Sequence, residues 1–157
     1  MKKAWKPILI WVLICLATGA IAGLLTREGT QIYSGMIQKP PLSPPRWVFP
    51  TVWTALYILM GVGAGLVWSQ PPSADRNRGI NRMIEQLIVN FFWSFLFFNA
   101  QAFGFSLLWL ILLWLLVLDM ILQFRKTVPL AAKLQIPYLL WLTFAAYLNA
   151  GVWWLNM

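Results

Sequence analysis

The amino-acid sequence predicts an all-α integral membrane protein, folded as a single bundle of five transmembrane helices. Of its 157 residues, 61% are hydrophobic and only 10% are charged, and the mean hydropathy is +0.71. A soluble domain of this size is far less apolar. Apolar runs near the ~20 residues that cross a bilayer recur along the chain. They predict helices at about residues 8–25, 45–68, 84–102, 106–124 and 134–155.

The five runs also define the domain organisation. They are continuously apolar, whereas strands of a membrane β-barrel alternate, so helices are preferred. Because the runs leave little chain outside the membrane, residues 1–157 are predicted to form one domain. The longest connection is the outer loop, residues 26–44, whose apolar side chains suggest that it folds onto the bundle. A cleavable signal peptide is the less favoured alternative for the first run, which is longer than a usual signal core.

The distribution of positive charge predicts the orientation in the membrane. The chain has 12 Lys and Arg against 4 Asp and Glu. With a cytoplasmic N-terminus, nine of these cations lie on the inner side and three, Arg27, Lys39 and Arg46, lie on the outer side. This bias follows the positive-inside rule and explains the basic composition without nucleic acid as a partner. We therefore expect a protein of the cell membrane, with its C-terminus and residues 26–44 outside.

The absence of histidine excludes several kinds of catalytic and metal site. A Ser-His-Asp triad, an imidazole metal site and a His-ligated haem all need a residue that this sequence lacks. No metal is expected. Among the four acids, only Asp119 lies within an apolar run. A carboxylate there is a candidate for function, but Asp119 is near the inner boundary and shares a helix face with Lys126, so a paired boundary carboxylate is favoured.

Polar and aromatic residues recur at helical spacing inside three of the predicted helices. Trp53 and Tyr57 are four residues apart, and the same spacing rule relates Asn90, Trp93, Ser94 and Phe97 in the third helix and Trp141, Ala145 and Asn149 in the fifth. Flat rings beside a few hydrogen-bonding groups suit a flat, mainly apolar ligand. The same polar groups can equally bond neighbouring helices to each other.

Three segments of the chain resemble the TspO/MBR family, which comprises tryptophan-rich sensory proteins and translocator proteins, also called peripheral-type benzodiazepine receptors. They are KPPLSPPRWVFPTVWTALYILMG (residues 39–61), NFFWSFLFF (90–98) and PYLLWLTFAAYLNAGVWWLN (137–156), in the family's order and spacing. The resemblance implies a five-helix bundle whose internal pocket opens toward the first long loop. It also implies a homodimer, and porphyrins such as protoporphyrin IX as ligands, with no required cofactor.

Carried onto this chain, the resemblance assigns a set of site residues. The pocket would be lined by Trp53, Tyr57, Asn90, Ser94, Phe97, Trp141, Ala145 and Asn149, and capped by Pro40, Pro41, Pro44 and Pro45. Some bacterial members degrade protoporphyrin under light with pocket tryptophans implicated, and these would be Trp53 and Trp141. Sterol binding is not expected, because the animal sterol motif needs a basic residue after Tyr147 that this chain lacks.

The proline cluster and the cations beside it lead to the functional prediction. A stiff loop over the pocket limits the entropy lost when a ligand is enclosed, and Ser43 would cap a helix that begins at Pro44 or Pro45. Porphyrin propionates would contact Lys39 and Arg46. We therefore expect a membrane receptor for porphyrins. The alternatives are a light-dependent porphyrin-degrading enzyme, a tetrapyrrole or lipid transporter, and a structural or regulatory partner protein.

Overall fold

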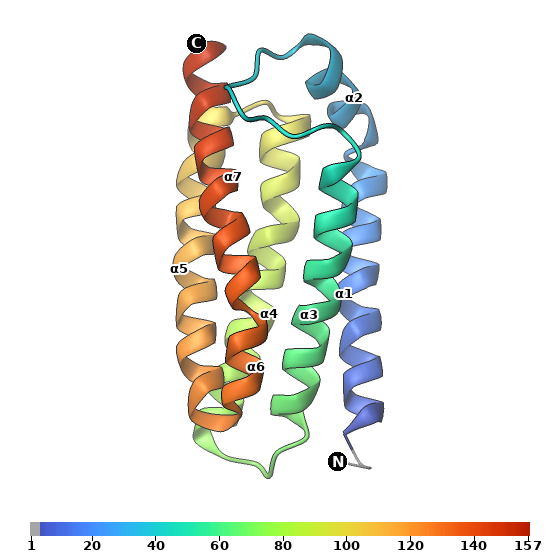
Figure 1. Ribbon diagram of the computed structural model, residues 1–157, viewed down its shortest axis with the longest axis vertical. Coiled ribbons are helices and arrows are strands. Elements are labelled where there is room, and N and C mark those ends of the chain that lie inside the picture. The colour runs from blue at the N-terminus through green and yellow to red at the C-terminus, as the bar shows by residue number, and fades with distance from the viewer. Residues whose placement is uncertain (1–3) are drawn as a thin grey trace.

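The structure, a computed structural model, describes residues 4–157 and contains helices and their connections in this range (Figure 1). Its elements are α1 (Trp5–Leu25), α2 (Arg27–Met36), α3 (Val48–Trp68), α4 (Ala74–Ser94), the π-helical η1 (Phe95–Asn99), α5 (Phe103–Thr127), α6 (Pro129–Leu134) and α7 (Ile136–Leu155). The predicted all-α class is confirmed. The predicted number of helices is not, because α2 and α6 are additional helices and η1 continues directly from α4.

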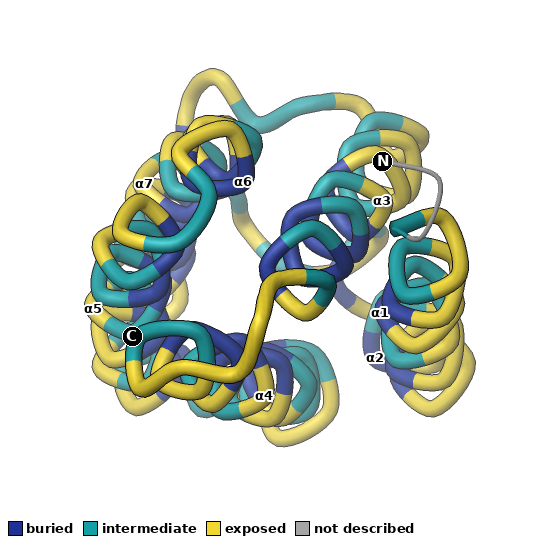
Figure 2. The backbone as a smooth tube through the Cα atoms, turned by 90° about the horizontal axis from the view of Figure 1, so that it is seen from below, coloured by how far each residue is buried: buried dark blue, intermediate teal, exposed yellow. Residues whose placement is uncertain are grey.

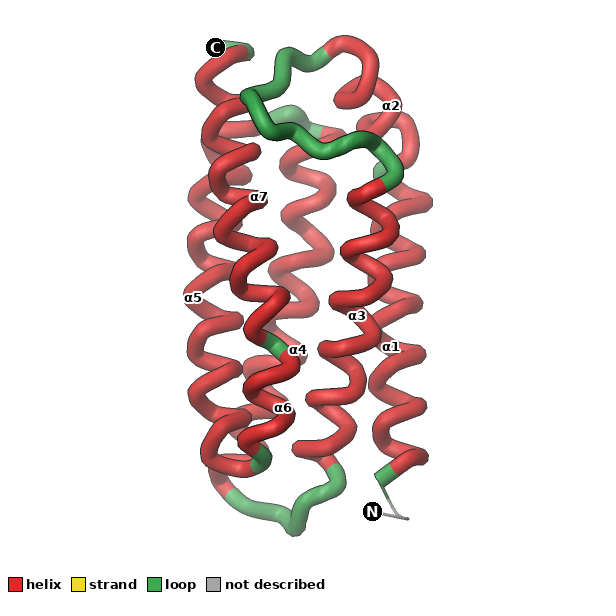
Figure 3. The backbone as a smooth tube through the Cα atoms, in the orientation of Figure 1, coloured by secondary structure: helices red, strands yellow, loops and turns green. Residues whose placement is uncertain are grey.

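Five of the helices are long and run along the long axis of the molecule (Figures 1 and 3). α1, α3 and α4 have 21 residues each, α5 has 25 and α7 has 20. Each is therefore about 30 Å long or longer, which matches the hydrocarbon core of a bilayer. Within the described residues, three of them, α1, α3 and α5, are both long and apolar enough to cross a membrane.

The outside of the bundle exposes large apolar side chains. α1 is the clearest case, with exposed Leu9, Leu13, Ile21 and Leu24. Figure 2 views the bundle from below, and its buried positions lie mostly on the inward sides of the helices. Lipid tails are as apolar as leucine, so this surface is compatible with a bilayer, whereas in water it would drive aggregation.

Segments that were predicted to be loops contain α2, α6 and the first part of α4. α4 begins at Ala74 rather than near residue 84, and the Ser73 hydroxyl caps it by accepting the Arg76 N–H at 3.1 Å. Its polar first half was mistaken for part of a solvated loop because only its second half is apolar. The outer loop 26–44 contains α2, whose Tyr33 ring packs against the rings of Phe97 and Phe98 at centroid distances of 5.3 and 5.5 Å. α2 buries Gly29 and Tyr33, which lie one turn apart, so packing on this one face stabilises α2.

Two predicted helix boundaries were also wrong. α3 begins at Val48, and the Ser43 hydroxyl donates to the Pro40 carbonyl at 2.7 Å instead of capping a helix. Pro50 therefore lies in the first turn of α3, where its missing N–H costs no helical hydrogen bond. The turn between the third and fourth predicted helices lies before Phe103, with Gln101 in the left-handed region at φ 51°.

α1 and α3 approach each other closely because α3 presents two glycines to α1. A Cβ added at Gly61 would overlap the backbone of Val12, and one at Gly65 would overlap the backbone of Ile8. This is the close approach that a GxxxG pattern permits between helices. The contact brings α1 against α3 in the half of the bundle away from α2, and it fixes the position of α3 relative to its neighbours.

Replacing Gly61 by alanine should destabilise this contact. The added methyl group meets the α1 backbone, which cannot rotate away as a side chain can, so the free energy of unfolding should fall by about 1–3 kcal/mol. Denaturant unfolding in detergent micelles measures the loss. The matched control is Gly23→Ala on α1, where an added Cβ has no atom within 4 Å. Equal stabilities of the two variants would contradict the close packing of α1 on α3.

Candidate functional site

The bundle encloses a cavity of about 1120 Å³ in the half nearest α2. Its walls come from α1, α3, α4, η1 and α7, and α2 and the segment that follows it cover one end. This end of the molecule, with α2 and residues 37–47, is called the loop side below. All eight residues that were predicted to bind ligand line this one cavity: Trp53, Tyr57, Asn90, Ser94, Phe97, Trp141, Ala145 and Asn149. The structure thus brings the predicted set together, and their binding of a ligand stays a prediction.

Aromatic rings form much of the cavity wall. The Trp53 ring lies 5.7 Å from the Tyr57 ring and 6.1 Å from the Tyr138 ring. The rings of Trp93 on α4 and Phe97 on η1 are nearly parallel, with centroids 5.1 Å apart. Such ring pairs are worth about 0.5–1.5 kcal/mol each beyond their buried area. The wall is therefore preorganised for a flat apolar ligand.

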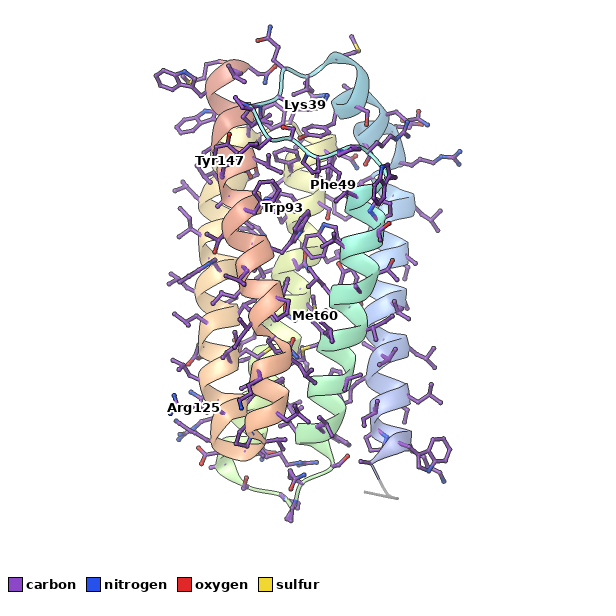
Figure 4. The ribbon with its side chains drawn as sticks, viewed as in Figure 1. Lys39, Phe49, Met60, Trp93, Arg125 and Tyr147 are labelled. Carbon is purple, nitrogen blue, oxygen red and sulfur yellow. The ribbon has the colours of Figure 1, made fainter. Side chains whose placement is uncertain are left out.

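A second aromatic pair closes the space between α3 and α7. The Phe49 ring of α3 meets the Trp141 ring of α7 edge to face, at a centroid distance of 6.1 Å. In Figure 4, Phe49 lies just below the loop, toward α7. The Trp141 indole N–H is buried and has no hydrogen-bond partner among the described residues. An unpaired buried donor is costly, so this N–H is available to an acceptor atom on a ligand.

Buried polar groups lie at the end of the cavity away from the loop. The Asn90 side-chain amide donates to the Tyr57 hydroxyl at 3.4 Å. One turn earlier in α4, and further from the loop side, Gln86 is fully buried and accepts a hydrogen bond of 2.8 Å from the Tyr138 hydroxyl. Gln86 was not predicted as part of this region. The signal was its spacing, because Gln86 precedes Asn90 by four residues and so continues the same helix face.

Both the oxygen and the NH₂ group of the Asn149 side chain form hydrogen bonds within the protein. Its side-chain oxygen accepts from the Trp93 indole N–H at 3.2 Å and from the Ser106 hydroxyl at 3.1 Å, and its NH₂ group donates to the Phe103 carbonyl at 2.8 Å. This amide therefore ties α7 to both α4 and α5. The alternative noted from the sequence, bonding between helices, accounts for the interactions that Asn149 makes in this structure.

The proline-rich segment is fastened to the C-terminal end of α7. Asn156 accepts from the Gln38 N–H at 3.1 Å and donates to the Gln38 carbonyl at 2.8 Å, while the Tyr147 hydroxyl donates to the Pro41 carbonyl at 2.7 Å. Gly151 of α7 lies directly under the Pro40 ring. We call these contacts the α7 clasp.

The four prolines predicted to cap the pocket divide into two groups. Pro44 lines the cavity, whereas Pro40, Pro41 and Pro45 lie outside its lining. Pro40 and Pro41 belong to the α7 clasp. Leu42 follows them in the left-handed region, at φ 68°. These four prolines therefore shape the segment over the cavity, and of the four only Pro44 borders the space itself.

Three cations and no acids line the cavity, and the cations are Arg27, Lys39 and Arg46. The Lys39 ammonium donates to the Ser34 carbonyl at 3.1 Å and to the Ile37 carbonyl at 3.4 Å. It also lies 5.1 Å from the centre of the Tyr33 ring, and burial raises the pKa of this phenol. Figure 4 shows Lys39 within the loop side, at the opposite end of the molecule from Arg125.

Asp119 has no part in the cavity. Its carboxylate contacts the Arg82 side chain of α4 and accepts from the Gln123 amide at 3.1 Å, and Arg82 also contacts Glu85. The predicted pairing of this carboxylate is confirmed, although its cation is Arg82 and not Lys126. Across residues 4–157, no group of three or more Cys, Asp or Glu side chains is placed to hold a metal ion.

The fold defines a helical membrane protein with an internal cavity, and nine of the residues that line this cavity are aromatic. Comparison with known proteins gives its family. The model of the TspO/MBR family matches residues 11–155, and the chain belongs to this family.

Relatives with curated names come from bacteria and animals. The tryptophan-rich protein TspO of Chlorobaculum tepidum is 33% identical, over 99% of each chain. The translocator protein of Homo sapiens is 34% identical, over 98% of this chain and 92% of the human one. Protein CrtK of Rhodobacter capsulatus is 32% identical, over 94% of this chain and 91% of its own. The likeness therefore extends over the whole fold, and the protein is a membrane protein.

Proposed function

We propose that this protein is a membrane receptor that binds porphyrins of the protoporphyrin IX type, and related flat apolar ligands, in the cavity on the loop side. The observation that carries the proposal is the cavity of about 1120 Å³, walled by aromatic rings and supplied with few polar groups. Ligand sites of this kind hold most of the ligand's surface out of water and orient it through a few hydrogen bonds. The free indole N–H of Trp141 is one such group.

The proposed receptor crosses the bilayer five times, through α1, α3, α4, α5 and α7. Their lengths of 20 to 25 residues suit a bilayer. The cations support an orientation with the loop side outside, because Arg76, Arg78, Arg125, Lys126 and Lys133 belong to the opposite end of the bundle. A homodimer in the membrane is part of the proposal through the family resemblance.

Substitution of the two cavity tryptophans tests the proposal. Trp53→Phe and Trp141→Phe should each weaken protoporphyrin IX binding in darkness by about 3- to 10-fold, at about 1 kcal/mol for each altered aromatic contact. Porphyrin absorption and quenching of the remaining tryptophans measure the dissociation constant. The matched control is Trp154→Phe, an indole that is 73% exposed outside the cavity. Absence of saturable binding by the wild type would refute the tetrapyrrole receptor.

A second candidate function is light-dependent degradation of the bound porphyrin. It is supported by the placement of Trp53 and Trp141 in one cavity, where Trp53 also adjoins the Tyr57 and Tyr138 rings. The excited porphyrin would be oxidised by oxygen there, while these side chains donate an electron to it transiently and regain that electron within the same cycle. Illumination of the complex with product analysis separates this enzyme from a receptor, because an enzyme converts many porphyrins per chain without losing its tryptophans.

A further inference from the structure

The three cations of the cavity lining differ in what they contact, and this difference bears on the charge of the ligand. The lining contains Arg27, Lys39 and Arg46 and no aspartate or glutamate. A cavity with only positive groups at its rim attracts anions and disfavours cationic ligands.

Lys39 is occupied within the protein. Its ammonium donates to the Ser34 and Ile37 carbonyls at the C-terminal end of α2 and lies over the Tyr33 ring at 5.1 Å. Carbonyls at a helix C-terminus have no partner in the helix and carry partial negative charge, so a cation there is stabilising. Lys39 therefore caps α2 and joins it to the segment that follows.

Arg27 and Arg46 are free of such contacts. Within the described chain, neither guanidinium forms an ion pair or a side-chain hydrogen bond, and both residues are exposed. Arg27 is the first residue of α2, and Arg46 lies two residues before α3 begins. The start of α2 and the segment before α3 thus each bring one unpaired guanidinium to the rim of the same cavity.

We propose that Arg27 and Arg46 bind the two carboxylates of the flat ligand, and that Lys39 holds the loop instead of contacting the ligand. The proposal rests on the porphyrin receptor proposed above and assigns the residues that contact the charged groups of its ligand. Guanidinium pairs with carboxylate through two parallel hydrogen bonds, and it does so better than an ammonium group. The apolar body of the ligand occupies the aromatic cavity while its carboxylates stay at the wet rim, which avoids the cost of burying unpaired charge.

The test compares protoporphyrin IX with its dimethyl ester, which has the same ring but no carboxylates. Binding of each compound is measured in darkness to the wild type, to Arg27→Gln, to Arg46→Gln and to the double variant. Two control variants are Lys39→Met, which keeps an apolar side chain of similar length, and Arg125→Gln, which makes the same charge change at the opposite end of the molecule.

Each arginine variant should weaken binding of the dicarboxylate about threefold and the double variant about tenfold, as expected for ion pairs near a surface. Ester binding should not change in these variants. Added salt should weaken dicarboxylate binding to the wild type and have little effect on the double variant. Lys39→Met should change the affinity for both compounds by the same factor, and Arg125→Gln should change neither.

Equal loss of acid and ester binding in the double variant would overturn the proposal, as would acid-selective loss in Lys39→Met alone. Failure of the receptor proposal would give another result, because the wild type would then bind neither compound saturably. If the double variant bound the dicarboxylate as tightly as the wild type does, and still bound the ester, the role of the two arginines would be refuted. The proposal that the protein is a porphyrin receptor would still hold.

Discussion

Asn149→Leu should lower the free energy of unfolding by about 1–3 kcal/mol, because it leaves the buried Trp93 indole N–H without a partner. The substitution removes the acceptor of this N–H and one of the two acceptors of the Ser106 hydroxyl, which still donates to the Phe103 carbonyl, and it also removes a donor to that carbonyl. Leucine has the same number of side-chain heavy atoms and the same branching at Cγ, so the effect measures hydrogen bonds more than packing. Denaturant unfolding in detergent micelles gives the loss.

A double-mutant cycle between Asn149→Leu and Trp93→Phe checks the cause. Because the two side chains are hydrogen-bonded, the double variant should be less destabilised than the sum of the single variants, by about 1 kcal/mol. Ser94→Ala is the control, since Ser94 also lines the cavity but forms no side-chain hydrogen bond within residues 4–157. Additive losses in the cycle would contradict the central role given to the Asn149 amide.

Asn156→Leu should speed dissociation of a ligand from the cavity about 30-fold. Two of the hydrogen bonds in the α7 clasp are lost, each worth about 1 kcal/mol, so the segment over the cavity opens more readily. The two bonds join Asn156 to the backbone of Gln38. Tyr147→Phe removes the remaining hydrogen bond of the clasp, to the Pro41 carbonyl, and should add a smaller increase. Stopped-flow displacement of bound protoporphyrin by excess competitor measures the dissociation rate.

Thr143→Val is the matched control for the clasp. Thr143 also lies on α7 and bonds through its hydroxyl, but its partners are Leu139 and Trp114 and not the proline-rich segment. Its substitution should leave the dissociation rate unchanged. The same dissociation rate in Asn156→Leu and the wild type would show that the clasp does not control ligand exchange.

Apolar runs in the sequence were sufficient to predict the five long helices but not all of their ends. The first turns of α4, from Ala74, are polar and basic, and its buried apolar residues begin only at Ile80, so the start of this helix is set by the Ser73 cap. α2 is short and contains two glycines, and it is held by the packing of Tyr33 on Phe97 and Phe98. Local propensity is a weak guide where contacts distant in sequence decide the structure.

The predicted site residues were found because helical spacing places side chains on a common face. Trp53 and Tyr57, or Asn90 and Ser94, lie one turn apart, and the family resemblance then joined the faces of three helices. The α7 clasp could not be found in this way. Gln38 and Asn156 are 118 positions apart in the chain, and no local pattern relates a backbone group to a distant amide. The different roles of Lys39 and Arg27 likewise depend on contacts that only the folded chain defines.

The most direct test of the proposed ligand site is an experimental structure of the protein with protoporphyrin IX bound in darkness. We expect ligand density inside the cavity of the loop side, in contact with Trp53, Trp93 and Trp141, with the α7 clasp closed over it. Density on the membrane-facing surface, with this cavity empty, would contradict the proposal that the cavity is the receptor's ligand site.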